Sequence, residues 1–178
     1  MGRSYTGWVH KPFVVNVGAL RRGGVHATEA HCCGVLTGIA VSASHVPDNA
    51  EIQVDAVLEV ASGTSILVTG TITAPWVGDC RRCLGPAEGT LVSTVRELYE
   101  DRPDPEETYK LHGDQLDLEP LVRDAVLLEL PHAPLCSASC AGLCPVCGID
   151  RNTGTCSCET ELNDPRWAAL DVLRARDD

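Results

Sequence analysis

Alternating apolar and polar positions predict an antiparallel hairpin in the middle of the chain. From Glu51 to Val60 every second residue is apolar, which is the period of a strand that buries one face. Ser62 and Gly63 supply a turn, and residues 66–74 repeat the alternation. We therefore expect two paired strands joined by a short loop.

Other β segments are predicted less sharply. Gly89 to Tyr99 has the composition of a third strand, and residues 13–17 that of a short leading strand before a Gly-rich turn at 21–24. Residues 30–50 are ambiguous, with an apolar stretch at 34–41 that suits a strand. The chain up to residue 100 is therefore predicted to be rich in β structure.

A helical period follows a charged segment. Residues 101–107 combine charge and proline without a large apolar side chain, which is typical of an exposed linker. Beyond them Asp117 suits an N-cap, Pro120 is tolerated in the first turn, and Pro131 ends the helix. The predicted apolar face comprises Leu118, Leu121, Val122, Ala125, Val126 and Leu128.

These elements predict an α+β fold in which a chiefly antiparallel β-sheet is backed by the helix. A short terminal helix is expected from Asp164 and Pro165, a cap followed by an N1 proline, and it presents Trp167 to the body. We divide the chain into a β-rich domain (1–100), an acidic linker containing proline (101–116), a packing helix (117–134) and a Cys-rich module with the terminal helix (135–178).

Composition and charge narrow the function classes. The 178 residues are 44% hydrophobic, enough for one core, but only 4% aromatic, which disfavours a binder that stacks nucleotide bases. The net charge is −11, and residues 97–130 hold eleven acids against three basic residues, which would repel RNA phosphates. Direct RNA contact would need a restricted basic surface, and the acidic stretch is interpreted as a solvated face.

Eight of the ten cysteines form close pairs. The pairs are Cys80 with Cys83, Cys136 with Cys140, Cys144 with Cys147, and Cys156 with Cys158. One turn that presents two sulfurs provides half of a tetrahedral zinc site, so four pairs predict one or two structural zinc ions. In the run Cys144-Pro-Val-Cys147, the glycine that follows permits the tight turn that aims backbone amides at thiolates.

Disulfides are the rival interpretation of these cysteines. The N-terminal apolar run, about eight residues long, is too short for a secretory signal. The chain also lacks the roughly 18 consecutive apolar residues of a membrane helix. We therefore expect a soluble cytoplasmic protein, in which thiols stay reduced and clustered cysteines favour metal. Residues 135–158 hold few large apolar residues, so a bound ion is the simplest cause of order there.

The pairs can combine in more than one way. One arrangement has a local site of Cys144, Cys147, Cys156 and Cys158, and a clamp in which Cys80 and Cys83 meet Cys136 and Cys140. The clamp closes a long loop, but that cost grows only logarithmically, whereas a zinc site contributes roughly 10 kcal/mol. Alternatively, because one residue separates Cys156 from Cys158 where two to four are usual, Cys158 binds no metal and Cys136 or Cys140 takes its place. Cys32 and Cys33 are interpreted as a buried small hydrophobe beside an exposed thiol.

No catalytic constellation is predicted. The chain has no His-x-Glu or His-Glu-x-x-His motif, and all-thiolate sites are closed, so we expect no enzyme. His132, four residues before Cys136, is the one histidine placed to join a site. Arg81 and Arg82 are possible partner contacts, although neutralising a zinc tetrathiolate is the favoured role. They would also lower a thiol pKa, so the alternative function is a zinc-thiolate redox switch or redox-regulated chaperone.

Several motifs carry a resemblance to a known family. In order, the chain contains Val68-Thr69-Gly70-Thr71, Cys80-Arg81-Arg82-Cys83-Leu84, the helix from Asp117 to Leu130, the knuckle Gly142-Leu143-Cys144-Pro145-Val146-Cys147-Gly148, and Asp164-Pro165-Arg166-Trp167. With these it resembles the YceD family of large ribosomal RNA accumulation proteins, over nearly all of the chain after Val14. The Cys-rich tail matches the form found in many members.

The resemblance implies a non-catalytic role in bacterial ribosome biogenesis that supports accumulation of 23S ribosomal RNA. Because some relatives lack the tail, it also implies that metal acts as a stabiliser. The partners expected are a ribosome-assembly protein or a pre-large-subunit particle, contacted with or without direct binding to RNA. No membrane and no small-molecule substrate is expected.

Overall fold

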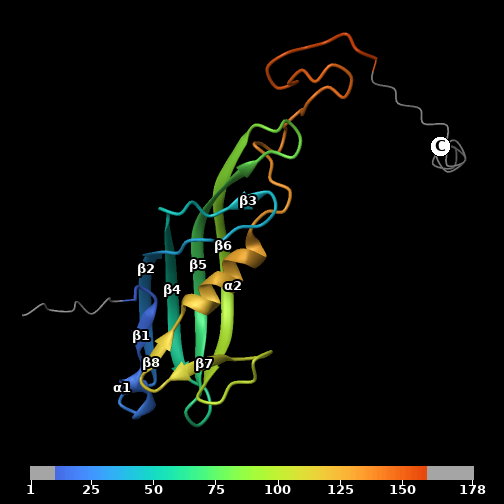
Figure 1. The fold of residues 1–178 in the computed structure, drawn as a ribbon. Helices are drawn as coiled ribbons and strands as arrows, with labels where there is room; N and C mark the ends of the chain where they lie inside the picture. Colours follow the sequence, from blue (N-terminus) through green and yellow to red (C-terminus); the bar gives the residue numbers. More distant parts are fainter. Residues whose placement is uncertain (1–10, 160–178) are drawn as a thin grey trace, which may run out of the picture.

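Eight strands form one sheet in the computed structural model, which describes residues 11–159 (Figure 1). The strands are β1 (Val14–Asn16), β2 (Ala27–Val35), β3 (Ser44–His45), β4 (Glu51–Val60), β5 (Ile66–Asp79), β6 (Pro86–Glu100), β7 (Tyr109–His112) and β8 (Gln115–Asp117). Their order is β1-β8-β7-β6-β5-β4-β2, with β3 beside β5. Pairs are antiparallel except β6 with β7, which is parallel. The described helices are α1 (Gly18–Arg21) and α2 (Glu119–Glu129).

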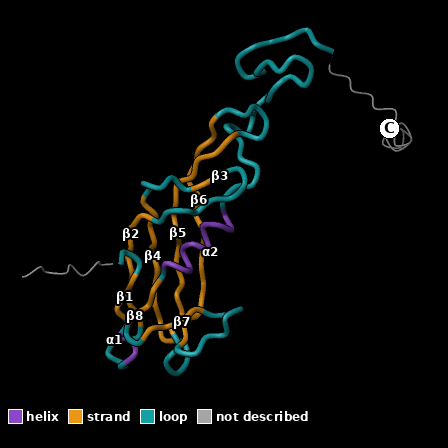
Figure 2. The backbone as a smooth tube through the Cα atoms, viewed as in Figure 1, coloured by secondary structure: helices purple, strands orange, loops and turns teal. Residues whose placement is uncertain are grey.

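The predicted hairpin is confirmed as β4 and β5, in which Val60 pairs with Ile66. Alternate β4 side chains are buried, as their period requires. The third strand begins earlier than predicted, at Pro86, because β6 pairs with β5 from Pro86 to Tyr99. Residues 74–79 of β5 extend past the end of the β4 ladder and carry the Cys80–Cys83 turn. Figure 2 shows that the Cys-rich end beyond them consists of loops and turns.

Two segments differ from the expectations. Residues 101–116 contain β7 and the start of β8, which bury Leu111 and Leu116, so this segment is a linker without strands only up to residue 108. The strand expected at 34–41 lies instead at Ala27–Val35, where all nine residues pair with β4. Its side chains alternate only weakly in polarity, and the pairing partner determines its position.

The core is built mainly from Val, Leu, Ile and Ala, which fits a chain with only 4% aromatic residues. Tyr99 of β6 is an exception: it is fully buried, donates a hydrogen bond to the Asp117 carbonyl (3.2 Å) and stacks on Tyr109 at 5.2 Å. Burial raises the pKa of Tyr99, so the phenol keeps its proton and remains a donor. Tyr99 therefore joins β6 to the short strands that follow it.

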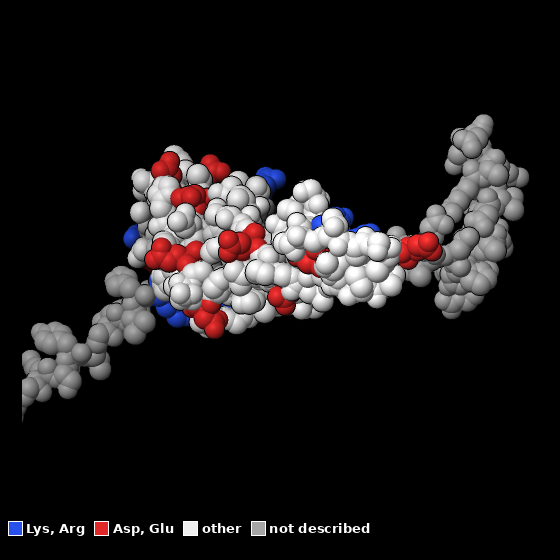
Figure 3. All heavy atoms as spheres, turned by 90° about the horizontal axis from the view of Figure 1, so that it is seen from above, with Lys and Arg blue, Asp and Glu red and all other residues white. Residues whose placement is uncertain are grey.

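Charged side chains are distributed over the body of the molecule. In Figure 3 the acidic groups are scattered on the face in view and the basic groups are fewer. Every acidic residue of the stretch 97–130 is exposed or half-buried, which agrees with its interpretation as solvated surface. Neither described helix has the length and apolarity needed to span a membrane.

Helix α2 covers a limited part of the sheet, so the fold is mostly β-sheet with little helix. It lies against β5 and β6 and buries four side chains in the core: Leu121, Val122, Ala125 and Val126. Leu128, predicted to belong to this face, is 82% exposed, and Leu130 is buried in its place. The backbone leaves the helical conformation after Glu129, where α2 ends. Asp117 is the last residue of β8, and its carboxylate accepts a hydrogen bond from the Glu119 N–H (3.0 Å).

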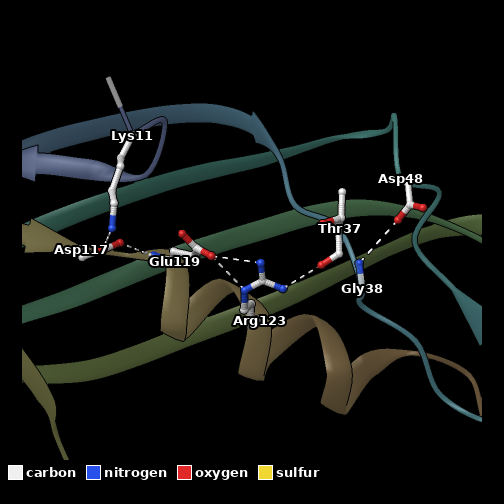
Figure 4. Close-up of polar contacts among 7 residues, drawn as sticks. All are labelled: Lys11, Thr37, Gly38, Asp48, Asp117, Glu119 and Arg123. Carbon is white, nitrogen blue, oxygen red and sulfur yellow. Dashed lines mark hydrogen bonds and ion pairs between the residues drawn. The ribbon is translucent and has the colours of Figure 1, made fainter. Parts of the chain in front are cut away.

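A polar contact ties α2 to the loop after β2. The Arg123 guanidinium binds Glu119 one turn earlier and donates to the Thr37 carbonyl (3.0 Å), as Figure 4 shows. This contact links the first half of α2 to the loop after β2. The terminal helix predicted from Asp164 lies outside the described residues.

Candidate metal centres

Four cysteine sulfurs meet where the β5–β6 turn faces the segment after α2. Cys80 and Cys83 come from the turn, and Cys136 and Cys140 from that segment; all four sulfurs lie within 4.8 Å of one another. The Cys80–Cys140 and Cys83–Cys136 sulfur distances are 3.8 Å and 3.6 Å. Sulfurs bound tetrahedrally to one zinc ion at about 2.3 Å lie about 3.8 Å apart. We call these four residues the first centre.

The first centre is joined firmly to the sheet. Cys80 and Cys140 are buried with Ala87 of β6, and Trp76 packs against them. The Arg81 N–H donates to the Pro134 carbonyl (2.9 Å), which links the turn to the segment after α2. The segment after α2 is thus joined to the β5–β6 turn by a backbone hydrogen bond as well as by contacts between sulfurs.

A second set of four sulfurs lies further along the chain. Cys144, Cys147, Cys156 and Cys158 also lie within 4.8 Å of one another, and we call them the second centre. The knuckle is closed by backbone hydrogen bonds from Gly148 to the Cys144 carbonyl and from Cys144 to the Ile149 carbonyl, both 2.9 Å. The structure thus brings the eight paired cysteines together in the clamp and local arrangement, and Cys158 lies with its neighbours.

We call the turns Cys80–Cys83 and Cys144–Cys147 the first and second knuckles. Each places a residue of positive φ directly after its second cysteine. In the first centre this is Leu84 (φ 59°), and in the second it is Gly148 (φ 74°). The left-handed conformation costs a residue with a side chain about 1–2 kcal/mol, but costs glycine little. The turn geometry predicted from the glycine is therefore present in both places, and Leu84 carries strain that Gly148 avoids.

Backbone amides point at one sulfur of each centre. Backbone N–H groups of Cys136 and Cys83 lower the pKa of Cys80 to about 6. The N–H groups of Cys147 and the residue before it likewise lower the pKa of Cys144 to about 6. Hydrogen bonding to the charged form favours the thiolate, the form that binds metal.

Other sulfurs hold their protons more tightly because of side-chain hydrogen bonds to neighbouring sulfurs. The side-chain hydrogen bond to Cys140 raises the pKa of Cys136 to about 12, and that to Cys147 raises the pKa of Cys158 to about 12. Each centre therefore combines one sulfur that loses its proton readily with one that holds its proton more tightly. An ion that binds all four sulfurs must displace these protons.

Replacing Gly148 with alanine is expected to weaken metal binding at the second centre roughly five-fold. The added Cβ strains the left-handed backbone, whereas alanine also lowers the conformational entropy of the unfolded chain and so offsets part of this strain. The net cost is about 1 kcal/mol. Apart from the two adjoining residues, no atom of residues 11–159 lies within 4 Å of the new Cβ, so the effect is conformational and not steric. Competition with a chelator measures it; an unchanged affinity would show that this turn does not control the centre.

The remaining predicted residues fall outside the two centres. Arg81 and Arg82 are exposed, and the Arg82 guanidinium donates to the Cys140 carbonyl (3.0 Å). His132 does not join either group of sulfurs. Cys32 is half-buried against the core and Cys33 is exposed.

Sequence reasoning missed one residue beside the first centre. The Asn152 amide donates to the Cys140 sulfur at 3.4 Å. Its only signal in the sequence is the Asp150-Arg-Asn152 run, a combination that favours Asx turns, within the loop between Cys147 and Cys156.

Comparison with known proteins identifies the family. The family model described as "Large ribosomal RNA subunit accumulation protein YceD" matches residues 68–174. An uncharacterised protein of Mycobacterium tuberculosis is 38% identical over 112 residues, covering 59% of this chain and 54% of its own length. One of Mycobacterium leprae is 35% identical over 138 residues, covering 74% of this chain and 61% of its own length.

A chloroplastic protein of Arabidopsis thaliana, named a large ribosomal RNA subunit accumulation protein YCED homolog, is 33% identical over 60 residues. That match covers 34% of this chain and 19% of the relative. The chain spans about half the length of the mycobacterial relatives it matches. No solved structure matches. Since the family model covers well over half of the chain, the protein belongs to the YceD family, which is described as large ribosomal RNA subunit accumulation proteins.

Proposed function

We propose that this chain supports accumulation of the large ribosomal subunit and its 23S RNA in the bacterial cytoplasm, without catalysing a reaction. The family description carries the proposal, and the name of the Arabidopsis relative agrees with it. The two sulfur clusters favour a structural role because four protein ligands leave no open position for a substrate.

The cofactor of the proposal is zinc, one structural ion in each centre. Four thiolates in tetrahedral reach of one another are the ligand set of structural zinc. The segment from residue 135 to 158 offers little apolar surface of its own, so bound ions would account for its shape. In this proposal residues 135–158 form a zinc module attached to the β-rich body.

The proposed partner is a ribosome-assembly protein or the pre-large-subunit particle, contacted through the Cys-rich end. Arg81 and Arg82 are both exposed there. Because Arg82 already donates to the Cys140 carbonyl, we assign the larger share of the contact to Arg81. Its guanidinium suits either a carboxylate or an RNA phosphate.

Depleting the protein in its source organism is expected to lower 23S relative to 16S ribosomal RNA. Re-expression of the wild type should restore the ratio, whereas Arg81→Glu, which reverses the proposed contact charge, should restore it only in part. Lys110→Glu is the matched control because it reverses an exposed charge on β7, away from both centres. A ratio that does not change on depletion would remove the proposal.

Exposed sulfurs favour a second candidate, a zinc-thiolate redox switch. Cys136 and Cys147 are both exposed. Hydrogen peroxide could oxidise two thiolates of one centre to a disulfide, while it takes up two protons and forms two waters, and the ion would leave. Rapid zinc release by peroxide together with altered partner binding would favour the switch; slow release favours the structural role.

A further inference from the structure

The short connection between the two centres is held from the side of the first one. Residues 140–144 run from the last cysteine of the first centre to the first cysteine of the second. Arg82, inside the first knuckle, donates from its guanidinium to the Cys140 carbonyl and accepts at its own carbonyl from the Leu143 N–H, both at 3.0 Å. Gly142 has a φ of +72°, and a Cβ there would lie 3.0 Å from the Arg82 carbonyl oxygen. The connection is therefore closely fitted to the first knuckle.

The same connection is held from the side of the second centre. The Arg151 N–H donates to the Gly142 carbonyl (2.9 Å) and the Asn152 side-chain oxygen accepts from the Ala141 N–H (2.8 Å). Both residues belong to the loop between Cys147 and Cys156, whose ends the second centre gathers. Asn152 thus belongs to a loop whose ends are ligands of the second centre, although its side-chain amide contacts the Cys140 sulfur of the first centre.

The orientation of the Asn152 amide is determined by its neighbours. The Asp150 carboxylate accepts from the Asn152 backbone N–H (2.9 Å) and from its side-chain nitrogen (2.7 Å). An ionised carboxylate can only accept, so the NH₂ group must face it, and the oxygen must face the Ala141 N–H. The second hydrogen of that NH₂ group is then available to the Cys140 sulfur.

We infer that Asn152 is a positioning residue through which the two metal centres bind their ions cooperatively. An ion in the second centre orders the loop and presents the Asn152 N–H to the Cys140 thiolate, which spreads the negative charge of the first centre. Outer-shell partners of this kind change metal affinity 10- to 100-fold. By linkage, an ion in the first centre strengthens the second by the same factor. The inference rests on the proposed zinc binding.

A double-mutant cycle on the full chain tests the inference with cadmium-113 as the probe metal. The NMR resonance of each centre reports its own occupancy, and Cys147→Ser, which disables the second centre, assigns the resonance of the first. With both centres intact, Asn152→Ala is expected to weaken the first centre about 10-fold in chelator competition and to shift its resonance. In the Cys147→Ser background the same change should have less than about two-fold effect, because the loop is no longer ordered.

Controls separate this inference from the zinc proposal. Thr155→Ala, an exposed position in the same loop, should leave both resonances in place. Circular dichroism of the sheet confirms that each variant folds. An equal effect of Asn152→Ala in both backgrounds, or no effect in either, overturns the cooperative role while zinc binding stands. Absence of four-sulfur cadmium resonances in the wild type overturns both.

Discussion

Replacing Cys80 with serine is expected to lower the metal content of the purified protein from two ions per chain to one and to detach the Cys-rich segment from the sheet. Cys80 is fully buried and lies 3.8 Å from the Cys140 sulfur, so its loss removes one corner of the first centre. A structural thiolate site contributes roughly 10 kcal/mol, far more than the small apolar cluster around Ala87 can replace. Helix α2 and the sheet keep their own core and should stay folded.

Cys147→Ser is the matched variant because it removes one ligand of the second centre. At saturating zinc it should also retain one ion, but the segment after α2 should stay attached through Cys136 and Cys140. Metal analysis and limited proteolysis of residues 131–140 distinguish the two results: cleavage rises many-fold only for Cys80→Ser. Two ions retained by the Cys80→Ser protein would exclude the first centre as a metal site.

Tyr99→Ala is expected to destabilise the fold by about 3–5 kcal/mol, the range for removing a buried aromatic side chain. Tyr99 is fully buried, stacks on Tyr109 and bonds the Asp117 carbonyl, so its removal leaves a cavity where β6, β7 and β8 meet. Tyr99→Phe retains the ring and loses one hydrogen bond, which should cost about 1 kcal/mol.

Denaturant unfolding measures both changes. Val92→Ala, on the same strand but 60% exposed, serves as the control and should shift stability by less than about 0.5 kcal/mol. If Tyr99→Ala and Val92→Ala had similar effects, residues 109–117 would not form part of the main core. Metal content should be unchanged in all three variants because Tyr99 lies away from the sulfur clusters.

Elements that the sequence predicted correctly are those whose signal is local. The β4 alternation repeats over ten residues, and the apolar face of α2 is visible through Val126 because each period spans only a few positions. The exposure of Leu128 could not be predicted, since the periodic face does not reveal where α2 leaves the sheet. The limited cover that α2 gives the sheet likewise depends on how far the strands extend.

The short strands β7 and β8 were missed for a related reason. They have four and three residues and follow a run of charge and proline, so they present almost no period of their own. β7 pairs in parallel with the end of β6, and β8 pairs with β7 and β1, which places Leu111 and Leu116 in the core. Such pairings are tertiary contacts, and a scan of nearest neighbours does not detect them.

By itself the sequence determined the number of sulfur pairs and the turn chemistry of the Cys144–Cys147 knuckle, because two cysteines and the glycine after them interact within a few bonds. It also determined one-sided burial along the central strands. Only the tertiary structure decided which pairs meet: the β5–β6 hairpin extends past β4 and places Cys80 beside a cysteine sixty residues later. The same packing brings Asn152 to that cysteine's sulfur, a contact between two loops that no spacing in the chain encodes.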